Sequence, residues 1–206
     1  DKSKKLISEI NTMEAKELIN NEVNRLMKNF SNNKNVVYEL DDKPALPLYK
    51  MYIGYYANAL PASGLNFPLA VMSEDKNISV IRTLLAANDA DNSLTFAGNI
   101  KKGSTVRLLK SNHQNLINGA SNAAQQILDK GVNINEKAVA ICVSCVGRKL
   151  LMKEQVSDEV FAIQRLLGSK TGITGFYSNG EICSGENDSQ NQLHNQTMTI
   201  AYLSEG

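Results

Sequence analysis

The chain has 206 residues, and 22 Lys and Arg against 21 Asp and Glu give it a formal net charge of +1. That length is sufficient for the core of one large domain, or of a domain with an appendage. The near-neutral charge, with no basic cluster, argues against a nucleic-acid partner, and no apolar run reaches the roughly 18 residues of a membrane span. Three cysteines argue against a disulfide framework and favour a reducing, cytoplasmic compartment.

The first segment of the chain has a helical pattern. Apolar residues recur at three- and four-residue steps from Leu6 to Phe30, which predicts an amphipathic helix over residues 1–30. This helix either packs on the domain that follows or is the end of a preceding domain. The polar run SNNKN then interrupts the pattern. We therefore predict a helix or linker at 1–35 and one domain at 36–206.

The rest of the chain alternates between strand and helix patterns. Strands are expected at 36–40, 67–72, 78–86, 94–96, 105–109 and 137–145, with two more after residue 174, and helices at 45–60, 112–130 and 153–167. The segment 137–145 is almost wholly apolar, which predicts a central strand that is covered on both faces. The predicted fold is α/β in the broad sense (α+β), a mostly antiparallel mixed sheet of about six or seven strands packed with three or four helices.

Polar side chains are concentrated beside the last two expected strands. Their density exceeds what strand formation requires, so these groups either satisfy one another or meet a ligand. A further group follows the apolar strand at 137–145, where strand ends of α/β proteins usually form sites. The candidate ligand-binding residues from both regions and one earlier strand are Arg82, Ser144, Cys145, Arg148, Tyr177, Glu181, His194, Asn195 and Gln196.

The charged candidates leave two interpretations open. Arg82 interrupts an apolar strand, so it faces either solvent, a structural partner or an anionic ligand. Arg148 offers a two-pronged donor to a ligand carboxylate, or it forms a structural ion pair with Glu181. Glu181 in turn either makes that pair or binds the amino group of a ligand.

The cysteines do not form a redox or metal motif. Cys142 and Cys145 match C-x-x-C, but on a strand the two thiols point to opposite faces, about 10 Å apart between Cα atoms. No second ligand pair for zinc is present, and we expect no metal and no cofactor. An alternative function is a hydrolase or transferase that uses Cys145 with His194, although nothing in the sequence brings the two together.

Seven runs carry a resemblance to a known family. They are PALPLYKMYIG (44–54), LNFPLAV (65–71), IRTLL (81–85), LTFAGNIKKGSTVRL (94–108), SCVGR (144–148), TGFYSNGEI (174–182) and LHNQTMTI (193–200). In this order they resemble the C-terminal FIST domain, and the match extends over residues 36–203. The resemblance implies a ligand-sensing module of bacterial signal transduction, found with histidine kinases, chemoreceptor domains and cyclic-dinucleotide enzymes. Its implied ligands are small molecules such as amino acids, and its implied partners are an N-terminal FIST domain and an attached output domain.

The sequence therefore leads to a non-enzymatic sensory domain as the first hypothesis. In this hypothesis Arg82 and Arg148 hold a ligand carboxylate, Glu181 holds an amine, and the other candidates supply neutral hydrogen bonds. The cysteine-dependent enzyme is the second hypothesis. A protein-interaction scaffold is the third, since FIST domains also occur in F-box proteins, and it predicts an exposed apolar patch.

Overall fold

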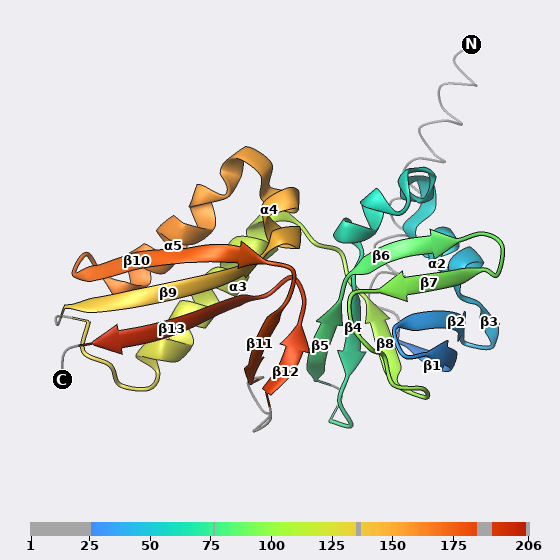
Figure 1. Cartoon of the computed structure of the whole chain (residues 1–206), viewed down its shortest axis with the longest axis horizontal. Helices are drawn as coiled ribbons and strands as arrows, with labels where there is room; N and C mark the ends of the chain where they lie inside the picture. Colours follow the sequence, from blue (N-terminus) through green and yellow to red (C-terminus); the bar gives the residue numbers. More distant parts are fainter. Residues whose placement is uncertain (1–25, 76, 135–136, 185–190, 205–206) are drawn as a thin grey trace, which may run out of the picture. The chain divides into compact units, whose positions relative to one another are not determined.

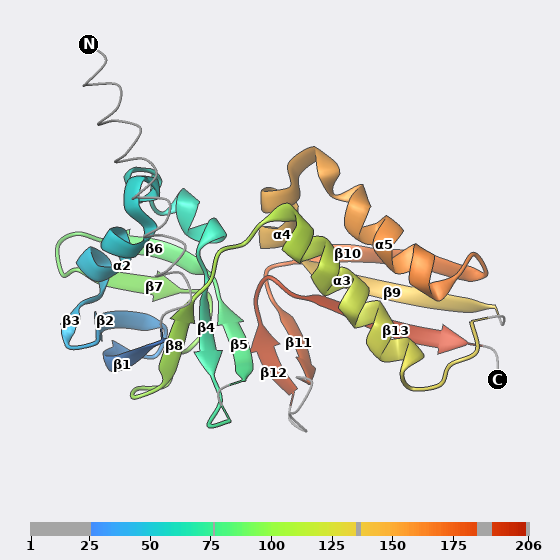
Figure 2. The same ribbon diagram turned by 180° about the vertical axis from the view of Figure 1, so that it is seen from behind.

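The computed structural model describes residues 26–75, 77–134, 137–184 and 191–204. The chain divides into two compact units, Asp1–Lys110 and Ser111–Gly206, whose elements are labelled in Figures 1 and 2. Both units combine helices with mostly antiparallel strands, which confirms the α+β class, although the strands are distributed over three sheets. Within the described ranges, no helix is long and apolar enough to cross a membrane.

The first unit is built on an antiparallel sheet with the strand order β5-β4-β8-β1-β2-β7-β6, and β3 pairs with β2. Its strands are β1 (Leu26–Asn33), β2 (Val36–Leu40), β3 (Lys43–Pro44), β4 (Leu69–Met72), β5 (Ile78–Arg82), β6 (Leu84–Asn88), β7 (Ser93–Phe96) and β8 (Thr105–Leu108). Helix α2 (Ala45–Ile53) and the 3-10 segments Gly54–Ala59 and Ala62–Asn66 follow β3. Leu46, Tyr49 and Ile53 of α2 are buried at three- and four-residue steps, so one face of the helix enters the core of this unit.

Three sequence expectations are corrected in this unit. The helix predicted to reach Phe30 is wrong from Leu26 onward, because Leu26–Asn33 is strand β1, paired with β2 and β8. Long-range strand pairing overrides the helical spacing there; the rest of that helix lies outside the described residues. Helix α2 ends before the predicted residue 60, because Gly54 takes a left-handed φ of 58°. The single strand predicted at 78–86 is two strands, β5 and β6, at opposite ends of the strand order.

The second unit contains a three-stranded sheet and a separate hairpin. In the sheet, β9 (Ala138–Cys145) lies between β10 (Thr171–Ser178), which is parallel to it, and β13 (Met198–Ser204), which is antiparallel. The hairpin consists of β11 (Glu181–Ser184) and β12 (Asn191–His194). The helices are α3 (His113–Leu128), α4 (Val146–Met152) and α5 (Ser157–Leu167), with a 3-10 turn, Lys153–Gln155, between the last two. Helix α4 had no counterpart in the sequence prediction.

Helices α3 and α5 lie on the same face of the three-stranded sheet (Figures 1 and 2). Small and aliphatic residues fill that interface, including Ala120 and Ala124 of α3, Ala140 of β9 and Ile163 of α5. The other face is open within the described residues, and its Phe176 and Leu203 side chains are 61% and 62% exposed.

The burial pattern of β9 explains the open face. Buried residues alternate with exposed or half-buried ones from Ala138 to Val143, although both sets are apolar. We expected β9 to be covered on both faces, but the described residues cover it on one face only. We call the uncovered surface the open sheet face; its residues are Val139, Ile141, Val143, Gly172, Thr174, Phe176, Thr199, Ala201 and Leu203.

Candidate functional site

Eight of the nine candidate residues lie in the second unit, near the C-terminal ends of the parallel strands β9 and β10. Cys145 ends β9, and Ser178, its partner in the register, ends β10. The chain then enters the β11–β12 hairpin, where Glu181 pairs with His194, and returns through residues 195–197 to β13. Cys145 donates its backbone N–H to the Thr197 carbonyl, 3.1 Å away, which joins this return segment to the end of β9. The C-terminal ends of parallel strands are a common position for binding sites.

A buried ion pair forms the side of this region that faces the helices. Arg148 of α4 donates from Nε and Nη2 to Oε2 of Glu159 on α5, at 3.0 and 2.8 Å. Its guanidinium also donates to the carbonyl oxygens of Leu116 and Gln196, at 2.7 and 3.4 Å. Glu159 is 0% exposed, so each charge depends on the other for compensation. The partner of Arg148 is thus Glu159, and the pair with Glu181 that the sequence left open is not formed.

Ser144 and Tyr177 complete the hydrogen bonding of Glu159. Both hydroxyl groups donate to its second oxygen, Oε1, from 3.1 and 3.2 Å. Burial, together with the negative charge of Glu159, raises the pKa of Tyr177 to about 12, so its hydroxyl remains a donor at neutral pH. The four residues, Ser144, Arg148, Glu159 and Tyr177, form a satisfied network that we call the Arg148 frame. It connects β9, β10, α4 and α5.

Glu159 was not among the predicted site residues. The apolar spacing of Val156, Val160, Ile163 and Leu167 predicts that these residues form the buried stripe of the helix, but Val160 is 40% exposed. Glu159, Ile163 and Leu167 are spaced by four residues, which places the carboxylate on the buried stripe. That spacing was the available signal, because an acidic residue in line with two core residues requires a buried cation.

Glu181 has a different environment from Glu159, although it is only 3% exposed. Its Oε1 accepts a hydrogen bond from Ser178 Oγ at 2.9 Å, and the same hydroxyl lies 3.0 Å from the Gly180 carbonyl oxygen. Its Oε2 accepts a hydrogen bond from Thr197 Oγ1 at 2.6 Å. Among the described residues no cation pairs with it, and no group of three or more His, Cys, Asp or Glu is arranged to hold a metal. Ser178 and Thr197 were not among the predicted site residues. They are identified only by their contacts.

Cys145 is buried beside Glu181. Burial raises the pKa of its thiol; the backbone N–H groups of Gln196 and Gly147 act in the opposite direction, and the charge of Glu181 raises the pKa further. A thiol with a raised pKa is a poor nucleophile at neutral pH, since the thiolate is the reactive form. This environment suits a residue that lines a site better than one that attacks a substrate.

The remaining three candidates follow each other after β12. His194, Asn195 and Gln196 are all buried, and Gln196 accepts a hydrogen bond at Oε1 from Ser111 Oγ at 3.0 Å. Asn195 is 1% exposed, and its Oδ1 has no hydrogen-bond partner among the described residues. A buried amide oxygen without a donor costs about 1–3 kcal/mol. It is therefore a feature that a ligand would explain.

Arg82 belongs to the first unit, whereas the other eight candidates belong to the second. It is buried at the end of β5, where Nε donates to the Asn99 carbonyl at 2.9 Å and Nη1 donates to the Ile81 carbonyl at 3.2 Å. Burial lowers the pKa of its guanidinium. Carbonyl oxygens of its own unit thus engage this cation, which agrees with the structural interpretation of Arg82.

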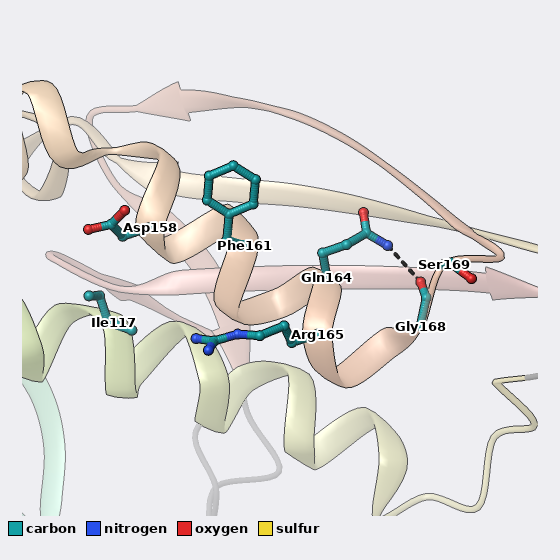
Figure 3. Close-up of a pocket in the computed structure, with 7 residues that line it drawn as sticks. All are labelled: Ile117, Asp158, Phe161, Gln164, Arg165, Gly168 and Ser169. Atoms are coloured by element: carbon teal, nitrogen blue, oxygen red, sulfur yellow. Dashed lines mark hydrogen bonds between the residues drawn. The ribbon is translucent and has the colours of Figure 1, made fainter.

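An open groove of about 740 Å³ lies elsewhere on the second unit, between α3 and α5. Figure 3 shows Ile117, Phe161 and Arg165 along it, and the Gln164 amide donating to the Gly168 carbonyl at its end. None of the nine candidate residues lines this groove. At the other end of the groove, the Asp158 carboxylate accepts a hydrogen bond at Oδ2 from His113 Nε2, 2.9 Å away, and His113 is half-buried.

Comparison with known families agrees with the resemblance found in the sequence. A model of the FIST C domain family matches residues 45–184, which is more than half of the chain. The chain belongs to the FIST C domain family. Comparisons with curated proteins and with solved structures gave no match. Membership of this family suggests a sensory domain of signal transduction, and the FIST C match includes parts of both units.

Proposed function

We propose that this FIST C domain is a non-enzymatic sensor that binds a small polar molecule at the ends of β9 and β10. The observation that carries the proposal is the convergence of Cys145, Glu181, Asn195 and their neighbours on one edge of the second unit. The concentration of buried polar groups there exceeds what the strands need. The orphaned amide oxygen of Asn195 supports a ligand rather than a purely structural role.

The contacts divide the site into a scaffold and a recognition part. The Arg148 frame is satisfied internally and would hold α4 and α5 against the sheet. Glu181, Asn195 and Cys145 would face the ligand. Amino acids are the first class to test, because a carboxylate, an amide and hydroxyl groups match their polar atoms.

Signalling would follow from differential binding. A ligand that stabilises one arrangement of the β11–β12 hairpin and the 195–197 segment shifts the equilibrium toward it, by the difference of its affinities for the two states. An attached output domain or an N-terminal FIST domain would read that shift. The raised pKa of Cys145 supports a binding role over a cysteine-dependent reaction.

The open sheet face favours a second candidate function, that of a protein-interaction scaffold. Phe176 and Leu203 are large apolar side chains on a surface with no charged residue among its members. Such patches are typical of protein interfaces. The two functions use different surfaces, so a scaffold would not depend on Glu181 or Asn195.

The first test of the proposed function is a thermal-shift screen of the whole chain against amino acids, small carboxylates, amines and sugars. A ligand at 100 times its Kd adds about 2.7 kcal/mol to the free energy of unfolding, and we expect a concentration-dependent rise of the melting temperature. Asn195→Leu keeps the side-chain volume but removes the buried amide, and it should abolish the shift. Asn122→Leu, at an exposed position of α3, is the matched control. A panel without any shift, or a shift that Asn195→Leu retains, would contradict the proposal.

A further inference from the structure

The two buried glutamates of the second unit differ in whether a cation compensates their charge. Glu159 has a guanidinium at 2.8 Å and two hydroxyl donors. Glu181 has two hydroxyl donors and no cationic partner among the described residues. Hydroxyl bonds alone compensate a buried carboxylate only in part, because a buried charge needs a counter-charge or several strong donors.

Apart from the two hydroxyl groups that donate to Glu181, the polar atom left without a partner near it among the described residues is an acceptor. Asn195 follows His194, the cross-strand partner of Glu181, and the Asn195 amide lies beside Gly180, 3.6 Å from the position that a Cβ on Gly180 would take. The free atom of that amide is the acceptor Oδ1. The oxygens of Ser178 and Thr197 also keep lone pairs after donating to Glu181. A ligand for this cluster must therefore bring N–H or O–H groups and a positive charge.

We infer that Glu181 and Asn195 recognise a primary ammonium group, so that the ligand of the proposed sensor is an amine. An ammonium group has three donors and no acceptor, which complements a carboxylate, an amide oxygen and hydroxyl oxygens. This inference rests on the proposed function and makes it narrower. It also changes the role of Arg148, whose guanidinium is held by Glu159 and two carbonyl oxygens and is not needed for a ligand carboxylate.

Gly180 lies close to β12. A Cβ at this position would come within 2.9 Å of Leu193 Cδ1 and 3.4 Å of the His194 carbonyl. The Asn179-Gly180 turn therefore packs closely against β12 while it carries Glu181 into the site.

The test compares compounds that share a skeleton and differ in charge: butylammonium with butyrate and butanol, and alaninamide with alanine and N-acetylalanine. Binding to the whole chain is measured by thermal shift at neutral pH and then by calorimetry, with potassium chloride at equal concentration as the ionic control. The ammonium compounds should raise the melting temperature, whereas the compounds without an ammonium group and potassium chloride should not. Glu181→Gln should weaken ammonium binding about 10- to 100-fold, the range of a charge-assisted hydrogen bond.

Two further variants distinguish a loss of binding from a loss of folding. Glu154→Gln removes the same charge from an exposed position and should leave binding unchanged. Thr197→Val removes the hydroxyl that donates to Glu181 Oε2, and it should weaken binding less than Glu181→Gln does. Circular dichroism of each variant checks that the fold is retained.

The outcomes separate the inference from the proposed function. Binding of the carboxylate-only or neutral compounds at the site, or ammonium binding that Glu181→Gln leaves intact, overturns the ammonium inference while the sensor proposal stands. An equal shift with potassium chloride overturns it in favour of a simple cation site. No shift with any compound of either panel overturns both.

Discussion

Two glutamates of the second unit are almost fully buried, yet their surroundings are opposite. Glu159 neutralises Arg148, which is itself buried, in a network where every partner has another partner. Glu181 has no such cation among the described residues and is held by Ser178 and Thr197. The first arrangement is that of a structural ion pair, and the second is that of a group whose charge is kept at a cost in stability.

The two glutamates should respond differently to neutralisation. Glu159→Gln leaves the Arg148 guanidinium buried without a counter-charge, and we expect it to lower the free energy of unfolding by about 3–5 kcal/mol. Glu181→Gln removes an uncompensated charge and should change the free energy of unfolding by less than about 1 kcal/mol, in either direction. Urea denaturation followed by circular dichroism measures both.

Glu154→Gln, at an exposed position, controls for the loss of one charge and should have no measurable effect. Equal destabilisation by Glu159→Gln and Glu181→Gln would show that Glu181 also has a structural role. The ammonium inference would then lose its energetic argument.

At the scale of elements, the parallel pair β9–β10 has one position where the two backbones come unusually close. A Cβ on Gly175 would collide with the Cys142 carbonyl oxygen and would lie 2.8 Å from its carbon. Gly172, on the same strand and in the same register, would place a Cβ 3.8 Å from the Ala138 carbonyl, an ordinary contact. A side chain can therefore be accommodated at Gly172 but not at Gly175, although both residues belong to β10.

Gly175→Ala should therefore weaken the β9–β10 pairing. Relief of the collision requires a backbone shift, and overpacking of this kind costs about 1–3 kcal/mol. The shift would also displace Tyr177 and Ser178, which follow on the same strand and contact Glu159 and Glu181. Chemical denaturation of Gly175→Ala measures the loss, and Gly172→Ala, expected to stay within about 0.5 kcal/mol, is the matched control. Equal stability of the two variants would mean that the close approach is not maintained in solution.

On the scale of the whole molecule, the chain contains two units with separate cores. The core of the first unit includes Leu46, Tyr49, Phe67 and Phe96. The core of the second is smaller and consists of residues such as Ala124, Ala140 and Ile163 from α3, β9 and α5. The region that matches the family, 45–184, includes parts of both units, so it does not correspond to one compact unit.

Each core suggests that its unit holds together by its own contacts. We expect a fragment of residues 111–206 to show helical and strand signals by circular dichroism and to unfold cooperatively in urea, because all contacts of the Arg148 frame lie within it. Dispersed amide resonances in a ¹H–¹⁵N spectrum of the fragment would provide the same evidence at residue level. A fragment without a cooperative transition would show that the second unit depends on the first.

The sequence alone determined the family and indicated which polar residues lie near one another in the second unit. The run of motifs from 44 to 200 was sufficient for the family, and the polar residues at the end of β9 and beside β11 and β12 do come together. Both results depend on local patterns. A strand that ends at Cys145 follows from short-range sequence features. The two strands expected after residue 174 are instead four, β10 to β13, and the pairing of Glu181 with His194 is seen only in the structure.

The tertiary structure decided how the charges are paired and which surfaces are covered. From the sequence, the partner of Arg148 was either a ligand carboxylate or Glu181. In the structure Arg148 pairs with Glu159, which lies on the buried stripe of α5. The structure likewise places Arg82 in the first unit and the other candidates in the second, and it makes Leu26–Asn33 a strand. Among the described residues, it covers one face of β9 instead of two. These features depend on residues that are distant in the sequence and meet only on folding. Spacing along the chain shows that a buried charge needs a partner, but not which residue it is.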